Sequence, residues 1–397
     1  MEGVPLSTPS RILSVADVHE LIEFRRDLHA HPEIAFEETR TAAFVAERLR
    51  ALGLEPRTGV GRTGVVATIR GARPGRTVLL RADLDALPMQ EENEVPYRSQ
   101  IPNRMHACGH DCHVAGLLGV AKQLVRQAPS LPGAVKLCFQ PAEEQGGGAI
   151  GMIADGVLRD PQVDAAFGVH VWQDLAVGKV GVTRGGWMAS VDDFAVTVTG
   201  RGAHAAAPHQ GIDPVVALAH IITALQTIAS RTTDPLLEVV VSVTQLRAGT
   251  AFNIIPGSAW MNGTVRAFDT ALWQELPGRF ERIVQGVAGA LGCTAEIVFT
   301  RHNRPVVNDP GMAELAHAAA AEVVGRENVV THIRTMGGED FSVFLHEVPG
   351  AFLAVGSRNE QKGLTHMHHH PRFDVDEDCI AIGAEVLLRV ARRFLEA

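Results

Sequence analysis

The sequence predicts an α/β protein: a mixed, mainly parallel sheet flanked by helices, with a smaller βαββαβ (ferredoxin-like) domain inserted into the larger one. Its length of 397 residues favours two domains. Over residues 16–171, short apolar runs rich in β-branched residues alternate with helical patterns, as in sheets of buried parallel strands. From about residue 190, the expected strands alternate between apolar and polar residues, which indicates a sheet with one solvated face.

The larger domain is expected to begin with two helices and to continue with buried strands. Apolar residues recur at helical spacing in residues 16–29 and 39–52, and Gly53 ends the second helix. The expected strands are residues 64–69, 77–82, 134–139 and 164–171. Their short length and β-branched content favour strands that are covered on both faces.

The inserted domain is predicted from the order of its elements. The expected strands are residues 191–200, 237–246, 258–268 and 294–301, and the helices are residues 214–229 and 270–291, the latter despite Pro277. This order is the split βαβ motif. After residue 310 the chain returns to mixed helix and strand. We therefore expect residues 1–187 and 305–397 to form the larger domain and residues 188–304 the inserted one.

Composition and charge exclude several classes of function. The net charge is −9 and no Lys/Arg run exceeds two residues, so we expect no nucleic-acid or membrane partner. The first ten residues have neither a basic start nor an apolar stretch, unlike a secretion signal. No segment approaches 18 uninterrupted apolar residues. Five scattered cysteines favour a reducing cytoplasm.

Polar side chains follow three of the expected strands. Asp83 and Asp85 come after one strand and the pair Glu143–Glu144 after another, while a third is expected to end at His170. The carboxyl ends of parallel strands meet at one edge of a sheet, where α/β proteins bind their ligands. These side chains are therefore expected to form one site.

The segment HACGHDCH, residues 106–113, is rich in metal-binding side chains. Its two cysteines are separated by three residues, so it is neither a C-x-x-C redox motif nor a C-x-x-C-H haem attachment site. A structural zinc site usually needs a second pair of Cys or His. An open catalytic site remains, in which Cys108 and His110 combine with a glutamate and a histidine from the strand ends. HMHHH (366–370) is either a solvated loop or the source of a further ligand.

Together these motifs resemble the metal-dependent amidohydrolases of the aminoacylase and hippurate hydrolase type, relatives of carboxypeptidases with two clustered metal ions. The resemblance runs from RRDLHAHPE (25–33) through RADLDALP, HACGHD, FQPAEE, GRGAHAAAPH and TAFNIIP to MGGEDF and HHPRFD. It implies two divalent ions per subunit (zinc, manganese, cobalt or nickel), a homodimer or homotetramer, and a dimerisation or lid role for the inserted domain.

The resemblance also implies roles for individual residues. The implied metal ligands are Cys108, His110, Glu144, His170 and His369. Glu143 is the implied general acid/base, with Asp85 in support. From the inserted domain, His204 reaches toward the site, often that of the partner subunit, and Asn253 and Arg266 face the substrate. The backbone of Gly338 lies near it. Wider peptidase relatives carry histidine at the position of Asp83 and a bridging aspartate at that of Cys108, and thiolate favours softer ions.

The function expected from these residues is metal-dependent hydrolysis of N-acyl amino acids to a carboxylic acid and an amino acid. Glu143 would move the proton from water to the leaving nitrogen, and Arg266 would hold a substrate carboxylate. One alternative is a dipeptidase or carboxypeptidase. Another is a non-catalytic protein that binds metal or a small molecule, which the presence of Glu143 disfavours.

Overall fold

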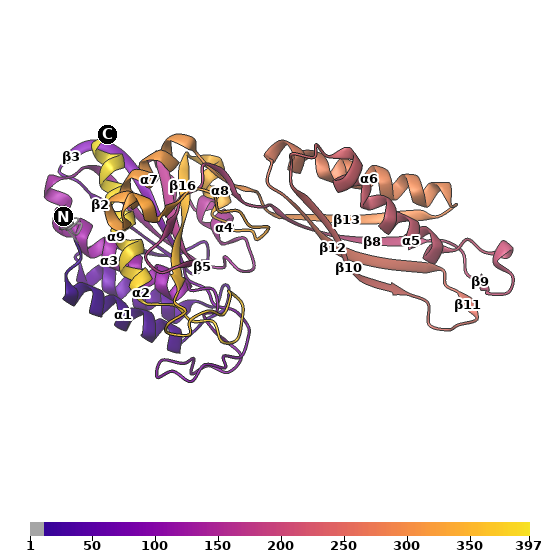
Figure 1. The fold of residues 1–397 in the computed structure, drawn as a ribbon, viewed down its shortest axis with the longest axis horizontal. Coiled ribbons are helices and arrows are strands. Elements are labelled where there is room, and N and C mark those ends of the chain that lie inside the picture. Colours follow the sequence, from indigo (N-terminus) through magenta and orange to yellow (C-terminus); the bar gives the residue numbers. More distant parts are fainter. Residues whose placement is uncertain (1–11) are drawn as a thin grey trace, which may run out of the picture. The chain divides into compact units, whose positions relative to one another are not determined.

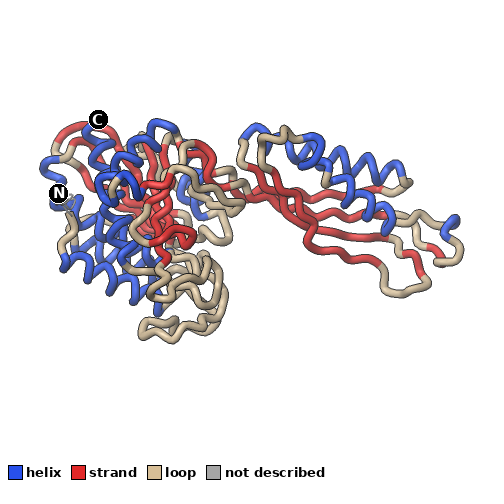
Figure 2. Tube along the Cα trace, viewed as in Figure 1, coloured by secondary structure: helices blue, strands red, loops and turns tan. Residues whose placement is uncertain are grey.

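The computed structural model describes residues 12–397, which divide into two compact units (Figures 1 and 2). The larger unit comprises the chain up to Gly185 together with Val307–Ile333 and Asp340–Ala397. The smaller unit comprises Gly186–Val306 and the short segment Arg334–Glu339. The prediction about a secretion signal concerns residues 1–10, which lie outside the described part of the chain.

An eight-stranded sheet forms the centre of the larger unit, in the order β1-β2-β4-β3-β5-β16-β6-β15. Its strands are β1 (Arg57–Val60), β2 (Gly64–Arg70), β3 (Arg73–Asp83), β4 (Pro132–Gln140), β5 (Ala165–Ala176), β6 (Val180–Gly181), β15 (Val329–Val330) and β16 (Gly350–Arg358). Strands β4, β3, β5 and β16 are mutually parallel, whereas β1 and β2 run antiparallel at one side. This confirms the predicted mixed, mainly parallel sheet.

Helices flank this sheet. They are α1 (Val15–Ala30), α2 (Thr39–Ala51), α3 (His110–Gln127), α4 (Gly148–Ala154), α7 (Pro310–Val324), α8 (Ser342–Glu347) and α9 (Asp378–Glu396). Val78, Leu80 and Ala82 of β3 share a core with apolar residues of α3 and α9. Because side chains alternate along a strand, Arg81 points to the other face and lies near the ring of Phe341, directly before α8.

Strand β5 differs from its prediction. It does not end at His170 but continues to Ala176. The strand continues because β16 pairs with residues beyond His170, as in the matches of Trp172 with Gly356 and of Ala176 with Arg358. His170 therefore lies within the strand, buried between its neighbours.

The smaller unit has a four-stranded antiparallel sheet in the order β10-β12-β8-β13. Its elements are β8 (Val191–Thr199), α5 (Pro214–Leu225), β10 (Val239–Ala248), β12 (Ser258–Ala267), α6 (Thr270–Ala290) and β13 (Thr294–Asn303), in βαββαβ order. Two ribbons complete the chain: β9 (Ala203–His204) with β11 (Ile254–Ile255), and β7 (Gly185–Met188) with β14 (Val306–Asn308). Buried residues of β8 alternate with half-buried ones, and the buried ones pack against α5 and α6.

One apolar helix in the smaller unit bears on the prediction about membrane spans. Among residues 12–397, Pro214–Thr232 is long and apolar enough to cross a membrane by length and composition alone, with a mean hydropathy of 1.3. It is not an uninterrupted apolar run, because polar residues such as His220 and Thr223 interrupt it. Leu218, Ile221 and Leu225 of this helix pack in the core of the unit.

Candidate metal centre

The HACGHDCH segment forms the turn into helix α3. Cys108 precedes the helix, Gly109 caps it with a φ of 86°, and His110 is its first residue. A Cβ atom on Gly109 would lie 2.3 Å from Cγ2 of Val171, and its positive φ also disfavours other residues. A glycine between the two candidate ligands therefore lets the turn pack directly against β5.

The other candidate ligands come from three different segments. Glu143 and Glu144 follow the end of β4, and His170 lies in β5. His369 lies in the loop after β16, and its backbone N–H donates a hydrogen bond of 2.8 Å to the carbonyl oxygen of Ala107. This bond ties the His369 loop to the turn before α3.

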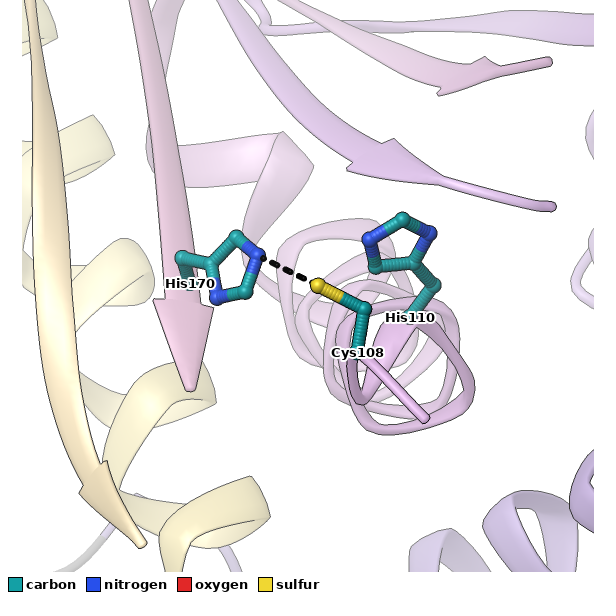
Figure 3. A group of neighbouring side chains, drawn as sticks. All are labelled: Cys108, His110 and His170. Carbon is teal, nitrogen blue, oxygen red and sulfur yellow. Dashed lines mark hydrogen bonds between the residues drawn. The ribbon is translucent and has the colours of Figure 1, made fainter. Parts of the chain in front are cut away.

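The structure brings all five predicted ligands together in overlapping groups, in each of which the ligand atoms lie within 4.8 Å of one another. The groups are Cys108 with His110 and His170, Cys108 with Glu144 and His369, and His110 with Glu143 and Glu144. Figure 3 shows the first group, with Sγ of Cys108 3.5 Å from Nε2 of His170. Cys108, His110 and Glu144 each belong to two of these groups, so the groups form one continuous cluster of possible ligands.

The polar atoms of this cluster fit a cation. Nδ1 of His110 lies 2.8 Å from the carbonyl oxygen of Asp85, which leaves Nε2 turned inward. Among residues 12–397, this Nε2 and Oε1 of Glu144 are buried without a hydrogen-bond partner, and they lie 3.9 Å apart. Oδ2 of Asp83 is 3.5 Å from the same Nε2. Buried polar atoms left unpaired are rare, and imidazole with carboxylate is a common ligand set for divalent metals.

Electrostatics differ between the two buried histidines. Burial lowers the pKa of His110, but the negative charge of Asp83 and the hydrogen bond to Asp85 outweigh it and raise the pKa to about 10. The acidic surroundings thus favour positive charge at His110. Burial and the neighbouring His113 hold the pKa of His170 well below its usual value. This ring is therefore neutral and has one nitrogen lone pair that it can offer to a metal.

Asp85 organises the glutamate pair. Its Oδ1 accepts a hydrogen bond of 3.0 Å from the backbone N–H of Glu143, and its Oδ2 accepts one of 3.0 Å from that of Glu144. Asp85 itself is 1% exposed. Asp85 therefore fixes the backbone of both glutamates through its buried carboxylate and the ring of His110 through its backbone carbonyl oxygen.

The residues predicted in the smaller unit fall into two groups. His204 pairs with Ile254 across the β9–β11 ribbon, and the carbonyl oxygen of Asn253 accepts a hydrogen bond from the N–H of Ala205. Figure 1 shows this ribbon beyond one end of the four-stranded sheet. Strand β12 begins at that end, with Ser258. Arg266 lies eight residues further along β12, roughly 26 Å away at strand spacing. Within one chain, therefore, His204 and Arg266 lie at opposite ends of the sheet.

Gly338 lies at the Arg266 end of that sheet. The segment Arg334–Glu339 joins the smaller unit because Thr335 pairs with Met188. A Cβ atom on Gly338 would lie 2.0 Å from Cγ2 of Val191, the first residue of β8. Only glycine lets the backbone approach β8 this closely.

Two buried residues near the cluster were not assigned from the sequence. Arg81 forms ion pairs with Asp83 at 2.7 Å and with Asp340 at 3.1 Å. Its signal was a charge inside the otherwise apolar run TVLLRA. His113 belongs to the HACGHDCH motif, but the sequence predicts no functional role for it, because nothing in the motif reveals what its ring contacts.

Comparison with known proteins places the chain among metal-dependent peptidases. Residues 79–393 match the model of peptidase family M20/M25/M40. The chain is 39% identical over 378 residues to N-acetyl-L-cysteine deacetylase of Bacillus subtilis, covering 95% of this chain and 89% of that protein. It is 40% identical over 378 residues to thermostable carboxypeptidase 2 of Saccharolobus solfataricus, with 94% and 95% covered. The Bacillus subtilis YXEP protein, a dinuclear metal-binding peptidase of family M20, has a similar structure (TM-score 0.85, 36% identity, 96% of this chain and 99% of that one).

Proposed function

The chain belongs to peptidase family M20/M25/M40, and on this premise we propose that it hydrolyses the amide bond of N-acyl amino acids to a carboxylic acid and a free amino acid. The observation that carries the proposal is the overlapping set of ligand atoms around Cys108, with Glu143 beside it. N-acetyl and hippurate-like N-benzoyl amino acids are the substrates proposed. The similarity to a deacetylase of N-acetyl-L-cysteine supports the N-acyl class.

In this proposal Cys108, His110, Glu144, His170 and His369 hold two divalent ions. Such ions, when bound, polarise an amide carbonyl and lower the pKa of water toward about 7. A thiolate with three imidazoles favours zinc, cobalt or nickel over harder ions, while the carboxylate of Glu144 also suits manganese.

Glu143 moves the proton in the proposed reaction. Its carboxylate takes a proton from the attacking water and then delivers it to the amide nitrogen as the amine leaves. Asp85 serves this step by holding the backbone of Glu143. Because successive residues point in different directions, Glu144 can bind metal while Glu143 faces the water.

The smaller unit binds the substrate and joins two subunits. The Arg266 guanidinium holds the substrate carboxylate, near the backbone of Gly338. His204, with Asn253, donates a hydrogen bond to the developing oxyanion of the partner subunit's reaction, worth about 3 kcal/mol. The separation of His204 and Arg266 along one sheet supports this division between two chains. A homodimer, or a tetramer built from it, is therefore part of the proposal.

The proposed location is the cytoplasm. The five cysteines of residues 12–397 form no disulfide bond, as expected in a reducing compartment. With a net charge of −9, the protein is proposed to act on small molecules without a nucleic-acid or membrane partner.

The test is amine release from N-acetyl and N-benzoyl amino acids and from unblocked dipeptides. Chelator-treated protein is compared with samples given zinc, manganese, cobalt or nickel. Metal-restored cleavage of the N-acyl compounds is the expected result. Preferential cleavage of dipeptides or of peptide C-termini would favour the carboxypeptidase alternative, which the similarity to carboxypeptidase 2 supports. Bound metal without any cleavage would indicate the binding protein instead.

A further inference from the structure

The backbone of Val171 contacts three histidines around the candidate metal centre. Its N–H donates a hydrogen bond of 2.9 Å to Nε2 of His113. Its carbonyl oxygen accepts one of 2.6 Å from Nδ1 of His170 and one of 3.0 Å from Nε2 of His368. These histidines come from α3, from β5 and from the loop that carries His369. The backbone of one residue, through the N–H before its Cα and the carbonyl after it, thus contacts three segments of the candidate centre.

These bonds determine where the protons lie on two of the rings. Nδ1 of His170 donates to Val171, so its Nε2 keeps the lone pair that faces Sγ of Cys108 at 3.5 Å. Nε2 of His113 accepts from Val171, so the proton of a neutral His113 is on Nδ1, 2.6 Å from Oδ1 of Asp83.

His113 lies close enough to the centre to suggest that it is itself a ligand, because its ring nitrogen groups with Asp83 and His110. However, both of its nitrogens already make hydrogen bonds, and the residue is 3% exposed. A ring bonded at both nitrogens offers no lone pair to a metal. A role in orienting the neighbouring groups fits this arrangement better.

We propose that His113 is a positioning residue that orients His170 through the backbone of Val171. By accepting the Val171 N–H, it fixes the backbone of Val171 on the side next to His170. The carbonyl of Val171, in the following peptide group, sets the tautomer and direction of the His170 ring. His368, in the loop after β16, donates a hydrogen bond to the same carbonyl oxygen. This proposal rests on the proposed function, since it assumes that His170 is a metal ligand. Partners of this kind typically contribute 10- to 100-fold to metal affinity.

The proposal predicts an effect on one ion more than on the other. His170 belongs to the group with Cys108 and His110, whereas the group of Cys108, Glu144 and His369 lacks it. Loss of the His113–Val171 bond should therefore weaken the first position and spare the second. A general loosening of the fold would weaken both.

Two isosteric variants of the full chain separate the two bonds of His113. In His113→Gln, the side-chain amide occupies the place of Nε2 and its oxygen can still accept from Val171. In His113→Asn, the amide occupies the place of Nδ1 and keeps only the bond to Asp83. The wild type and both variants are titrated with cobalt against a competing chelator. The absorption bands of bound cobalt are recorded, and the melting temperature of the metal-free protein serves as the control for folding.

The expected result is a loss of about 10- to 100-fold in affinity for one of two cobalt ions in the asparagine variant, with the glutamine variant within about threefold of wild type. Wild-type affinities in both variants, equal losses in both, or loss only in the glutamine variant would each overturn the proposal. A wild-type chain that binds no cobalt would contradict the metal centre itself. Activity is not the readout, so an error about the substrate would not imitate any of these results.

Discussion

Asp85 and Glu143 are joined by a hydrogen bond of 3.0 Å from the backbone N–H of Glu143 to Oδ1 of Asp85, although 58 residues separate them. The other carboxylate oxygen of Asp85 receives the N–H of Glu144. In Asp85→Asn, one of these two N–H groups would face an NH₂ donor. We expect kcat to fall by about 10- to 100-fold with a smaller change in KM. Unchanged kinetics on an N-acyl amino acid would mean that the glutamates hold their positions without Asp85.

Glu143→Gln should abolish turnover and leave the metal content intact. Glutamine has nearly the same shape but does not take a proton from water, so the loss should be at least about 100-fold. Turnover is measured by amine release, and metal content by elemental analysis of the same sample. Loss of metal along with activity would show that Glu143 is a ligand or a structural residue.

Cys108→Ala should lower the occupancy of both metal positions, because Cys108 belongs to two of the ligand groups. Cys138→Ala is the matched control. Cys138 is fully buried, and its Sγ contacts the sulfur of Met152. Metal per chain is measured after dialysis against a weak chelator. Equal occupancy in the two variants would remove Cys108 from the ligand set.

His204→Ala should reduce turnover by about 100-fold or more while metal content and folding stay normal. If His204 serves the partner subunit, a mixture of His204→Ala and Glu143→Gln chains, exchanged into hybrid dimers, should regain activity. In each hybrid, one of the two sites has both an intact Glu143 and an intact His204 from the other chain. Hybrids that remain inactive would place His204 in its own chain's site or outside catalysis.

Asp192 should make the stability of the protein depend on pH. Burial raises the pKa of this carboxyl from 3.8 to about 6, although the Trp273 ring N–H donates a hydrogen bond to it. A raised pKa in the folded state means that the ionised form destabilises the fold above about pH 6 and that this cost disappears as the pH falls toward 3.8. From pH 7.5 to pH 5, the free energy of unfolding of the wild type should rise by about 1.5 kcal/mol relative to Asp192→Asn. Urea unfolding of both proteins at the two pH values measures this difference, and parallel pH profiles would contradict it.

The sequence predicted the elements whose pattern is local. Continuous apolar runs identified strands of the larger unit, and alternating apolar residues identified strands of the smaller one. Burial on one or both faces of a sheet imposes these patterns of apolar residues on the sequence. The point at which a strand ends was not predicted correctly. Strand β5 continues past His170 because β16 supplies partners that local composition does not reveal. The helices α7, α8 and α9 were expected only as part of the mixed helix and strand after residue 310.

What the sequence determined by itself was the kind of chemistry: residue types, motif order and strand ends indicated a cysteine–histidine–glutamate metal centre with a neighbouring acid/base. What only the tertiary structure decided was which of these residues meet. Glu144 and His369 are distant in sequence, yet their side chains lie 3.5 Å apart. His204 was expected to reach a site that is often the partner subunit's, and only the structure shows that it and Arg266 lie at opposite ends of one sheet. His113 acquires its role from the N–H of Val171, a backbone group with no signature in the sequence. Hydrogen bonds depend on distance and angle between atoms, and only the folded chain fixes both.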